Sequence, residues 1–140
     1  DLLIPSIEGT LPTGDYSVRG LEHLVCVERK SLSDLLGCVG RDRERFEKCI
    51  QRMKAYETRV LVIEAGWGSI EAGQWRSQLK PTQVKAALYS WAKHVTIIPA
   101  GDPMAAARAV SDILLSAARQ RWEELRAFQQ SLKLVTQEGA

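Results

Sequence analysis

Residues 60–65 form the run that most constrains how this chain can fold. Val60-Leu61-Val62-Ile63 is apolar at four successive positions and rich in β-branched side chains, and Gly66 follows soon after. A strand with apolar side chains on both faces must be covered on both faces, which is the environment of a central strand between layers of helices. The sequence therefore predicts an α/β fold with this strand inside the sheet.

The remaining pattern alternates between strands and helices. Strands are expected at residues 15–18, 25–30 and 95–98, helices at 32–38, 42–56, 82–94 and from 103 to about 132, and a helical turn within 70–78. Pro81 and Pro103 suit helix starts, because the first helical position needs no amide hydrogen, and Ser31 suits an N-cap. We expect one domain, residues 1–140, with a mixed central sheet flanked by helices and a long C-terminal helix.

Three charged residues directly follow the apolar stretch 24–27. Side chains alternate along a strand, so Glu28 and Lys30 share one face while Arg29 points to the other. If residues 15–18 pair with this strand through the loop around Gly20, Asp15 comes beside Glu28. One or two carboxylates, waters and a substrate phosphate suffice for Mg²⁺, and we also consider Mn²⁺. Lys30 could then orient a water or offset charge in the transition state.

A simpler interpretation of these charges is also open. Exposed acids and lysines are abundant, and alternating charge is common on edge strands, so an acid-x-Lys triplet alone is weak support for a site. The surroundings favour a site, because a buried apolar strand that runs straight into three charges is unusual for a plain edge strand.

The motif residues are similar to those of a known family. Gly14-Asp15-Tyr16, followed by Glu28-Arg29-Lys30 and Asp34, resembles the nuclease domain of the XPF family of structure-selective DNA endonucleases, with its GDY and ERKxxxD pattern. The resemblance covers residues 11–65 and extends to the wider restriction-endonuclease-like superfamily, whose fold it implies. It implies that Asp15 and Glu28 are metal ligands, that Lys30 is the catalytic lysine, and that Arg29 and Asp34 support the site or the substrate.

The sequence departs from the family pattern at its start. Family members carry an Asp-x-Arg-Glu strand before GDY, and residues 1–13 contain nothing like it. Since the chain begins at Asp1 without Met, we expect that strand to lie upstream of the printed sequence. The helix-hairpin-helix domain that often follows the nuclease in this family has no counterpart after Leu132. Glu64 has two interpretations, an additional acid near Asp15 and Glu28, or a strand-end carboxylate that meets solvent.

The helical segment 41–59 is rich in basic residues. Arg41, Arg45, Lys48 and Arg52 are the positions we expect to contact DNA, since a basic helix can lie against the closely spaced phosphates of a duplex. The alternative is a solvated amphipathic helix with internal charge pairs, because acids are interspersed with the basic residues.

Composition gives only broad limits. The net charge of +2 does not by itself indicate a nucleic-acid partner. Cys26, Cys38 and Cys49 lack Cys-x-x-Cys spacing, so neither a disulfide framework nor a zinc site is supported. No apolar run approaches the ~20 residues of a membrane span. We expect an intracellular protein without membrane contact, cytoplasmic if bacterial or phage-derived and nuclear if eukaryotic.

The C-terminal helix carries more apolar surface than a small sheet needs. Its apolar positions include Val110, Ile113, Leu114, Ala117, Trp122, Leu125 and Phe128. In the resembled family the corresponding helices form a dimer interface, and we therefore expect a homodimer through these helices.

Three functions are compatible with these residues. The first is a Mg²⁺- or Mn²⁺-dependent DNA endonuclease, with branched or flapped DNA as the substrate that the resemblance implies. The second is a catalytically silent DNA-binding or scaffolding subunit of a nuclease complex; the complete set Asp15, Glu28, Lys30 and Asp34 favours the enzyme over this alternative. The third is an α/β domain in which the motif is accidental.

Overall fold

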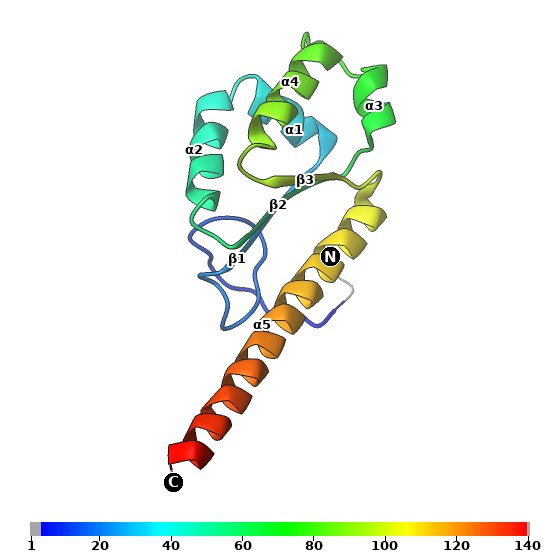
Figure 1. Ribbon diagram of the computed structural model, residues 1–140. Helices are drawn as coiled ribbons and strands as arrows, with labels where there is room; N and C mark the ends of the chain where they lie inside the picture. Colours follow the sequence, from blue (N-terminus) through cyan, green and yellow to red (C-terminus); the bar gives the residue numbers. More distant parts are fainter. Residues whose placement is uncertain (1–3, 140) are drawn as a thin grey trace.

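The fold places helices on both faces of a small sheet. The computed structural model describes residues 4–139, in the order β1 (Val25–Lys30), α1 (Leu32–Val39), α2 (Arg43–Met53), β2 (Thr58–Ile63), α3 (Trp67–Ala72), α4 (Pro81–Trp91), β3 (Thr96–Pro99) and α5 (Pro103–Gly139) (Figure 1). The predicted α/β class and the long C-terminal helix are confirmed. Within residues 4–139, no helix is both long and apolar enough to cross a membrane.

The sheet has three parallel strands in the order β1-β2-β3. β2 is therefore central, as its apolar run predicted. The expected antiparallel strand at residues 15–18 is reduced to a single bridge between Tyr16 and Val27. The chain leaves β1 after Tyr16 because residues 18–21 turn, with the Leu21 amide donating to the Val18 carbonyl at 2.8 Å.

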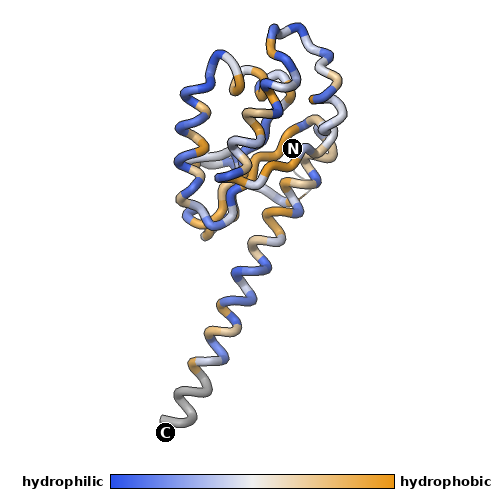
Figure 2. The backbone as a smooth tube through the Cα atoms, turned by 45° about the horizontal axis from the view of Figure 1, so that its top comes forward, coloured by the Kyte–Doolittle hydropathy of each residue, from blue (hydrophilic) through white to orange (hydrophobic). Residues whose placement is uncertain are grey.

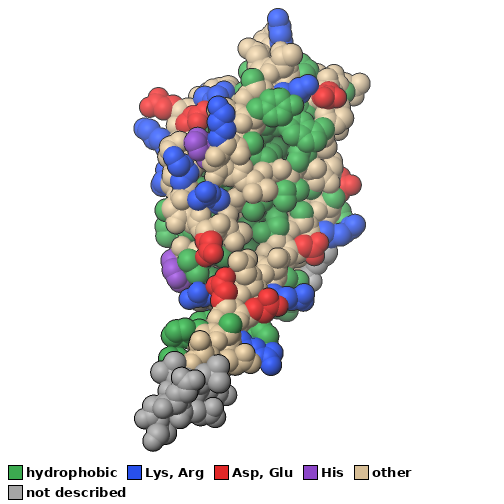
Figure 3. Space-filling view, in the orientation of Figure 1, with side chains coloured by type: hydrophobic (Ala, Val, Ile, Leu, Met, Phe, Trp, Pro, Cys, Tyr) green, Lys and Arg blue, Asp and Glu red, His purple; other side chains and the backbone are tan. Residues whose placement is uncertain are grey.

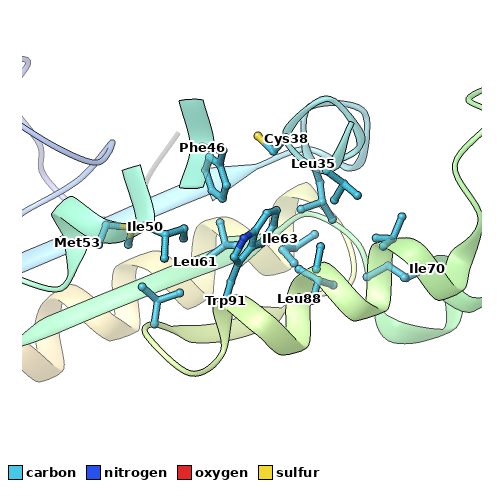
Figure 4. Close-up of a cluster of buried hydrophobic side chains, with 14 of the residues drawn as sticks. Leu35, Cys38, Phe46, Ile50, Met53, Leu61, Ile63, Ile70, Leu88 and Trp91 are labelled. Atoms are coloured by element: carbon cyan, nitrogen blue, oxygen red, sulfur yellow. The ribbon is translucent and has the colours of Figure 1, made fainter. Parts of the chain in front are cut away.

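Alternate side chains of β2 enter two separate apolar layers. Leu61 and Ile63 pack with residues of α1, α2 and α4, as Figure 4 shows around Trp91. Val60 and Val62 face the other way and pack with Val110 and its neighbours on α5. Burial of a Leu, Ile or Val side chain contributes about 1.5–3 kcal/mol, so both helix layers are fixed mainly by this central strand.

Several predicted boundaries are wrong by a few residues. α2 was expected to reach residue 56 but ends at Met53. After Met53 the backbone hydrogen bonds join residues three apart, such as the bond from the Tyr56 amide to the Met53 carbonyl at 3.0 Å. The Arg59 guanidinium donates to the carbonyls of Lys54 and Tyr56. Such capping satisfies carbonyls that have no partner within the helix.

The helix after β2 differs in its bounds from the prediction, and Gly73 explains where it ends. A helical turn was expected within residues 70–78, whereas α3 spans Trp67–Ala72. Gly73 ends the helix with φ 64°, a left-handed conformation that glycine adopts without a steric penalty. Smaller shifts place the end of α4 at Trp91 rather than residue 94, and move β2 to 58–63 and β3 to 96–99.

The C-terminal helix is longer than predicted, continuing past residue 132 to Gly139. It begins at an N-cap, where the Asp102 carboxylate accepts from the Ala105 amide at 2.7 Å. Its first part packs across the sheet, and its second part extends away from the rest of the domain (Figures 1 and 2). Apolar side chains on this second part therefore cannot be explained by the core.

Glu47 joins α2 to α4 through a charged hydrogen-bond network. Its carboxylate accepts from the Trp91 indole at 3.0 Å and from Arg43 Nε at 2.6 Å. Partial burial favours the neutral acid, but these two hydrogen bonds and the positive charges of Arg43 and His94 prevail and lower the pKa of Glu47. The ionised form is therefore the one that stabilises the folded state.

Substitution Glu47→Gln should destabilise the protein at pH 7 while leaving an acceptor for Trp91. Because the pKa is lowered on folding, this contribution is present above the ordinary glutamate pKa of about 4.3 and is lost as the pH falls through the lower folded value. Urea unfolding at pH 7 and near pH 3 would measure it. Glu44→Gln, at an exposed position paired with Lys48, is the control; an equal effect of both substitutions would contradict the role of Glu47.

Candidate functional site

Glu28 and Lys30 lie together at the carboxyl end of β1. Lys30 Nζ is 3.1 Å from Glu28 Oε1, and Glu28 is only 7% exposed. The Lys30 ammonium also lies over the Phe46 ring, 5.5 Å from its centroid. Both side chains face the layer formed by α1 and α2, so the alternation predicted from the sequence places them correctly.

Asp15 reaches this strand through a tight loop. Its amide and that of Tyr16 both donate to the Val27 carbonyl, at 2.9 and 3.0 Å. The Asp15 carboxylate accepts from the backbone amide of Arg29 at 2.8 Å. The strand that was expected to deliver Asp15 is absent from this segment, yet backbone contacts with β1 still bring the carboxylate to the neighbourhood of Glu28.

Gly14 makes that approach possible. Its φ of +83° is in the left-handed region, and a Cβ atom there would lie 2.6 Å from Cys26 Sγ and 3.2 Å from the Val27 carbonyl oxygen. Glycine alone avoids both the conformational and the steric cost. The glycine of the Gly-Asp-Tyr motif therefore has a packing role that positions the aspartate beside it.

The two carboxylates affect each other electrostatically. Burial raises the pKa of Glu28, and the negative charge of Asp15 raises it further, while Lys30 and Arg52 act in the opposite direction. For Lys30 burial lowers the pKa, but the attraction of Glu28 outweighs it and the pKa is raised. The ammonium is therefore held charged beside two acids.

The donor set fits a hard divalent cation with an open coordination sphere. Among the described residues no three or more His, Cys, Asp and Glu side chains gather into a metal-binding group, so a closed protein cage is not formed there. Mg²⁺ commonly uses one or two protein carboxylates and takes its other ligands from water and phosphate. Asp15 and Glu28 meet that requirement.

Arg29 lies outside this acid and lysine group. Its side chain is on the opposite face of β1, where Nε contacts Glu64 Oε1 at 2.8 Å and Nη2 donates to the Pro103 carbonyl at 3.1 Å. Burial lowers the pKa of Arg29, but interactions with Tyr16 and Glu64 prevail and raise it. Arg29 thus ties the loop of Asp15 to β2 and to the start of α5.

Neither interpretation of Glu64 is correct. The side chain is 19% exposed and forms an ion pair with Arg29, so it is neither free in solvent nor a member of the Asp15 and Glu28 group. Sequence reasoning treated Glu64 by itself, whereas its partner comes from the neighbouring strand. Parallel pairing of β1 and β2 brings the two residues together, since the Glu64 amide donates to the Lys30 carbonyl at 2.9 Å.

Asp34 is at the start of α1. Its amide donates to Ser31 Oγ at 3.1 Å, which confirms Ser31 as the N-cap, and its side chain is exposed. A carboxylate in the first turn interacts favourably with the helix dipole. The structure therefore places Asp34 on the helix start rather than within the buried group of Glu28 and Lys30.

The four basic residues expected to contact DNA fall into two groups. Arg41 and Arg45 form ion pairs with Asp42 at 3.3 and 3.6 Å, and Lys48 forms one with Glu44 at 3.5 Å; all three cations are largely exposed. Figure 3 shows basic and acidic side chains mixed on the side where α2 lies. Arg52 differs, because its Nε donates to Thr13 Oγ1 at 3.3 Å, beside the Asp15 loop.

Thr13 and Tyr16 are the site residues that sequence reasoning missed. Thr13 is 8% exposed, and its carbonyl accepts from the Cys26 thiol at 3.5 Å. Tyr16 packs in the layer beneath α5 and interacts with Arg29. Their positions next to Gly14 and Asp15 were the available signal, since a loop that must position one ligand is held by its neighbours.

One hollow of the described surface lies away from these residues. It has a volume of about 470 Å³ and is lined by residues 57–60 and 92–96. These segments are at the amino ends of β2 and β3, whereas Lys30 is at the carboxyl end of β1. The candidate site is therefore separate from this hollow.

Comparison with known proteins gives the family. The model of the ERCC4 domain matches residues 4–113, which include every residue of the site described above. The chain belongs to the ERCC4 domain family. This family includes nucleases and acts on DNA. The ERCC4 match ends within α5, before the part of the helix that extends from the domain.

A solved structure has the same fold. XPF from Aeropyrum pernix superimposes with a TM-score of 0.62 at 21% sequence identity, over 89% of this chain and 58% of that chain. The ERCC4 domain described here thus corresponds to little more than half of the Aeropyrum protein's chain. The XPF-type α/β fold implied by the motif is confirmed.

Substitution Gly14→Ala should destabilise the ERCC4 domain by about 1–3 kcal/mol, because the residue must keep a positive φ and its Cβ would meet Cys26. Urea unfolding followed by circular dichroism would measure the change. Gly9→Ala is the matched control, since its Cβ would meet nothing within 4 Å. Equal stability of the two variants would show that the loop does not require the close approach.

Proposed function

We propose that this ERCC4 domain is a divalent-metal-dependent DNA endonuclease that hydrolyses phosphodiester bonds. The observation that carries the proposal is the convergence of Asp15 on the face of β1 that bears Glu28 and Lys30. Membership of a nuclease family supports the same reaction. Following the family, we propose branched or flapped duplex DNA as the substrate, and hence a location inside the cell.

Each side chain has a distinct part in the proposed reaction. Asp15 and Glu28 would hold Mg²⁺ or Mn²⁺, with the scissile phosphate and waters as the other ligands. When bound, the metal would neutralise charge on the phosphate oxygens and activate the attacking water. Lys30, kept protonated by Glu28, would orient that water or offset the charge that develops as the P–O bond breaks.

The scaffold alternative remains a distinct outcome of the test. In the described segment 4–13 no strand precedes the Gly-Asp-Tyr loop, so the acidic strand typical of the resembled family is not among these residues. Asp15, Glu28 and Lys30 are nevertheless together, which favours the enzyme. A protein that binds branched DNA without cutting it would support the scaffold instead.

Labelled flap, fork and linear duplexes, each with and without Mg²⁺, would test the activity. Lys30→Ala should lower the cleavage rate by about 10²–10³-fold, the usual cost of removing one electrostatic stabiliser. Glu28→Gln should abolish cleavage and weaken Mg²⁺ binding. Lys93→Ala, at an exposed position after α4, should cleave like the wild type.

The folded state of each variant would be checked by thermal unfolding, since Lys30→Ala leaves the buried Glu28 without its ion-pair partner. Cleavage that survives a chelator or the Lys30→Ala substitution would refute the mechanism. Binding without cleavage would favour the scaffold function.

We also propose that α5 forms a homodimer. Trp122, Leu125 and Phe128 are 58%, 51% and 62% exposed on the part of the helix that extends from the domain. Both basic and acidic residues lie among them, at 121, 123, 124 and 126. This mixture suits a second copy of the helix better than a nucleic acid, because phosphates would meet the acids.

The double substitution Trp122→Glu/Leu125→Glu should convert a dimer into a monomer, since it places charge within the proposed interface. Sedimentation equilibrium at micromolar concentration would show the mass fall by half, with Gln129→Glu as the control on the same helix. A wild-type protein that sediments as a monomer would contradict the dimer.

A further inference from the structure

We infer that Arg52 binds the phosphodiester that is cut, as a second cation of the site in addition to Lys30, and that Thr13 orients the Arg52 side chain. The inference rests on the proposed nuclease function and deepens it by naming what recognises the phosphate. The Arg52 guanidinium would bind the two non-bridging oxygens of this phosphate, and the contact is independent of the DNA sequence.

Arg52 is anchored next to the residues that would hold the metal. Its Nε donates to Thr13 Oγ1 at 3.3 Å, and Thr13 is two residues before Asp15. The Thr13 carbonyl in turn accepts from the Cys26 thiol at 3.5 Å. Cys26 and Glu28 share one face of β1, about 6.6–6.8 Å apart along the strand. The guanidinium is therefore tied to the loop that carries Asp15, on the side of β1 that bears Cys26 and Glu28.

The remaining contacts of the guanidinium favour a ligand from solution. Nε is used by Thr13, while Arg52 as a residue is exposed on the surface of α2. Among the described residues, no hydrogen bond or ion pair uses the terminal nitrogens of Arg52, which leaves them for a ligand. An arginine edge presents two parallel N–H groups, whose spacing matches two oxygens of a phosphate.

Arg52 also differs from every other basic residue proposed to contact DNA. Arg41, Arg45 and Lys48 pair with acids of their own helix region and are 87%, 83% and 70% exposed. Their contacts are those of a solvated surface. Arg52 instead donates a hydrogen bond to Thr13, in the loop that carries a proposed metal ligand.

The competing explanation is structural. The Arg52 to Thr13 hydrogen bond could serve only to fasten α2 to the Asp15 loop. A fastening role predicts a loss of stability when the side chain is changed. A phosphate contact predicts a loss of salt-dependent DNA affinity and of catalytic rate, so the two explanations differ in their readouts.

Four variants separate these explanations: Arg52→Gln, Arg52→Lys, Thr13→Val and the charge-matched control Arg119→Gln, at an exposed position of α5. Cleavage of a labelled flap with Mg²⁺ gives kcat and KM for each. Fluorescence anisotropy with Ca²⁺ in place of Mg²⁺ gives DNA affinity over a range of salt concentrations. Thermal unfolding is recorded in parallel.

We expect Arg52→Gln to lower kcat/KM about 10²-fold and to reduce the slope of log affinity against log salt by about 0.9, the effect of one lost phosphate contact. Arg52→Lys should keep the slope of log affinity against log salt but recover little of kcat, because a lysine ammonium cannot donate two parallel hydrogen bonds to a phosphate. Thr13→Val should raise KM several-fold with the slope unchanged. Arg119→Gln should match the wild type.

Three results would overturn the inference. The first is an Arg52→Gln variant with the slope and kcat/KM of Arg119→Gln. The second is a loss of activity that is found only in variants whose melting temperature is also lowered. The third is a wild-type protein that does not bind DNA. A wild-type protein that binds but does not cleave would defeat the proposed function alone, since the change in salt slope would still report whether Arg52 contacts phosphate.

Discussion

The candidate site depends on one backbone contact, the pairing of the Gly-Asp-Tyr loop with β1 at Val27. The Asp15 and Tyr16 amides share the Val27 carbonyl, and the Val27 amide donates back to Tyr16. The contact is close enough that Gly14 has no room for a side chain. Everything proposed for the metal follows from it, because this pairing brings together the segments that carry Asp15 and Glu28.

The alternation of β1 then divides the charges between two faces. Glu28 and Lys30 face α1 and α2, where their mutual attraction opposes the cost of burying their charges. Arg29 faces α5, where it forms an ion pair with Glu64 and donates a hydrogen bond to the Pro103 carbonyl. One face can therefore hold a metal and act on a phosphate, while the other fastens the Asp15 loop to the sheet and to the long helix.

The helices have unequal roles around this centre. α2 contributes Phe46 beneath Lys30 and Arg52 beside the Asp15 loop. α5 covers the opposite face of the sheet and then extends beyond it, past the end of the ERCC4 match at residue 113. The site and the apolar part of α5 are thus separated by the sheet, so nuclease activity and self-association can be examined independently.

The sequence alone determined the α/β class, the central strand and the shared face of Glu28 and Lys30, because apolar runs and two-residue alternation are local properties. The Gly-Asp-Tyr and Glu-Arg-Lys motifs also led to the family. Only the tertiary structure decided that Asp15 arrives by a loop rather than a strand, that Glu64 pairs with Arg29, and that Arg52 alone among the proposed DNA contacts is tied to the site. Each of these joins residues distant in the chain, and such contacts are set by strand register and helix packing, which no local pattern encodes.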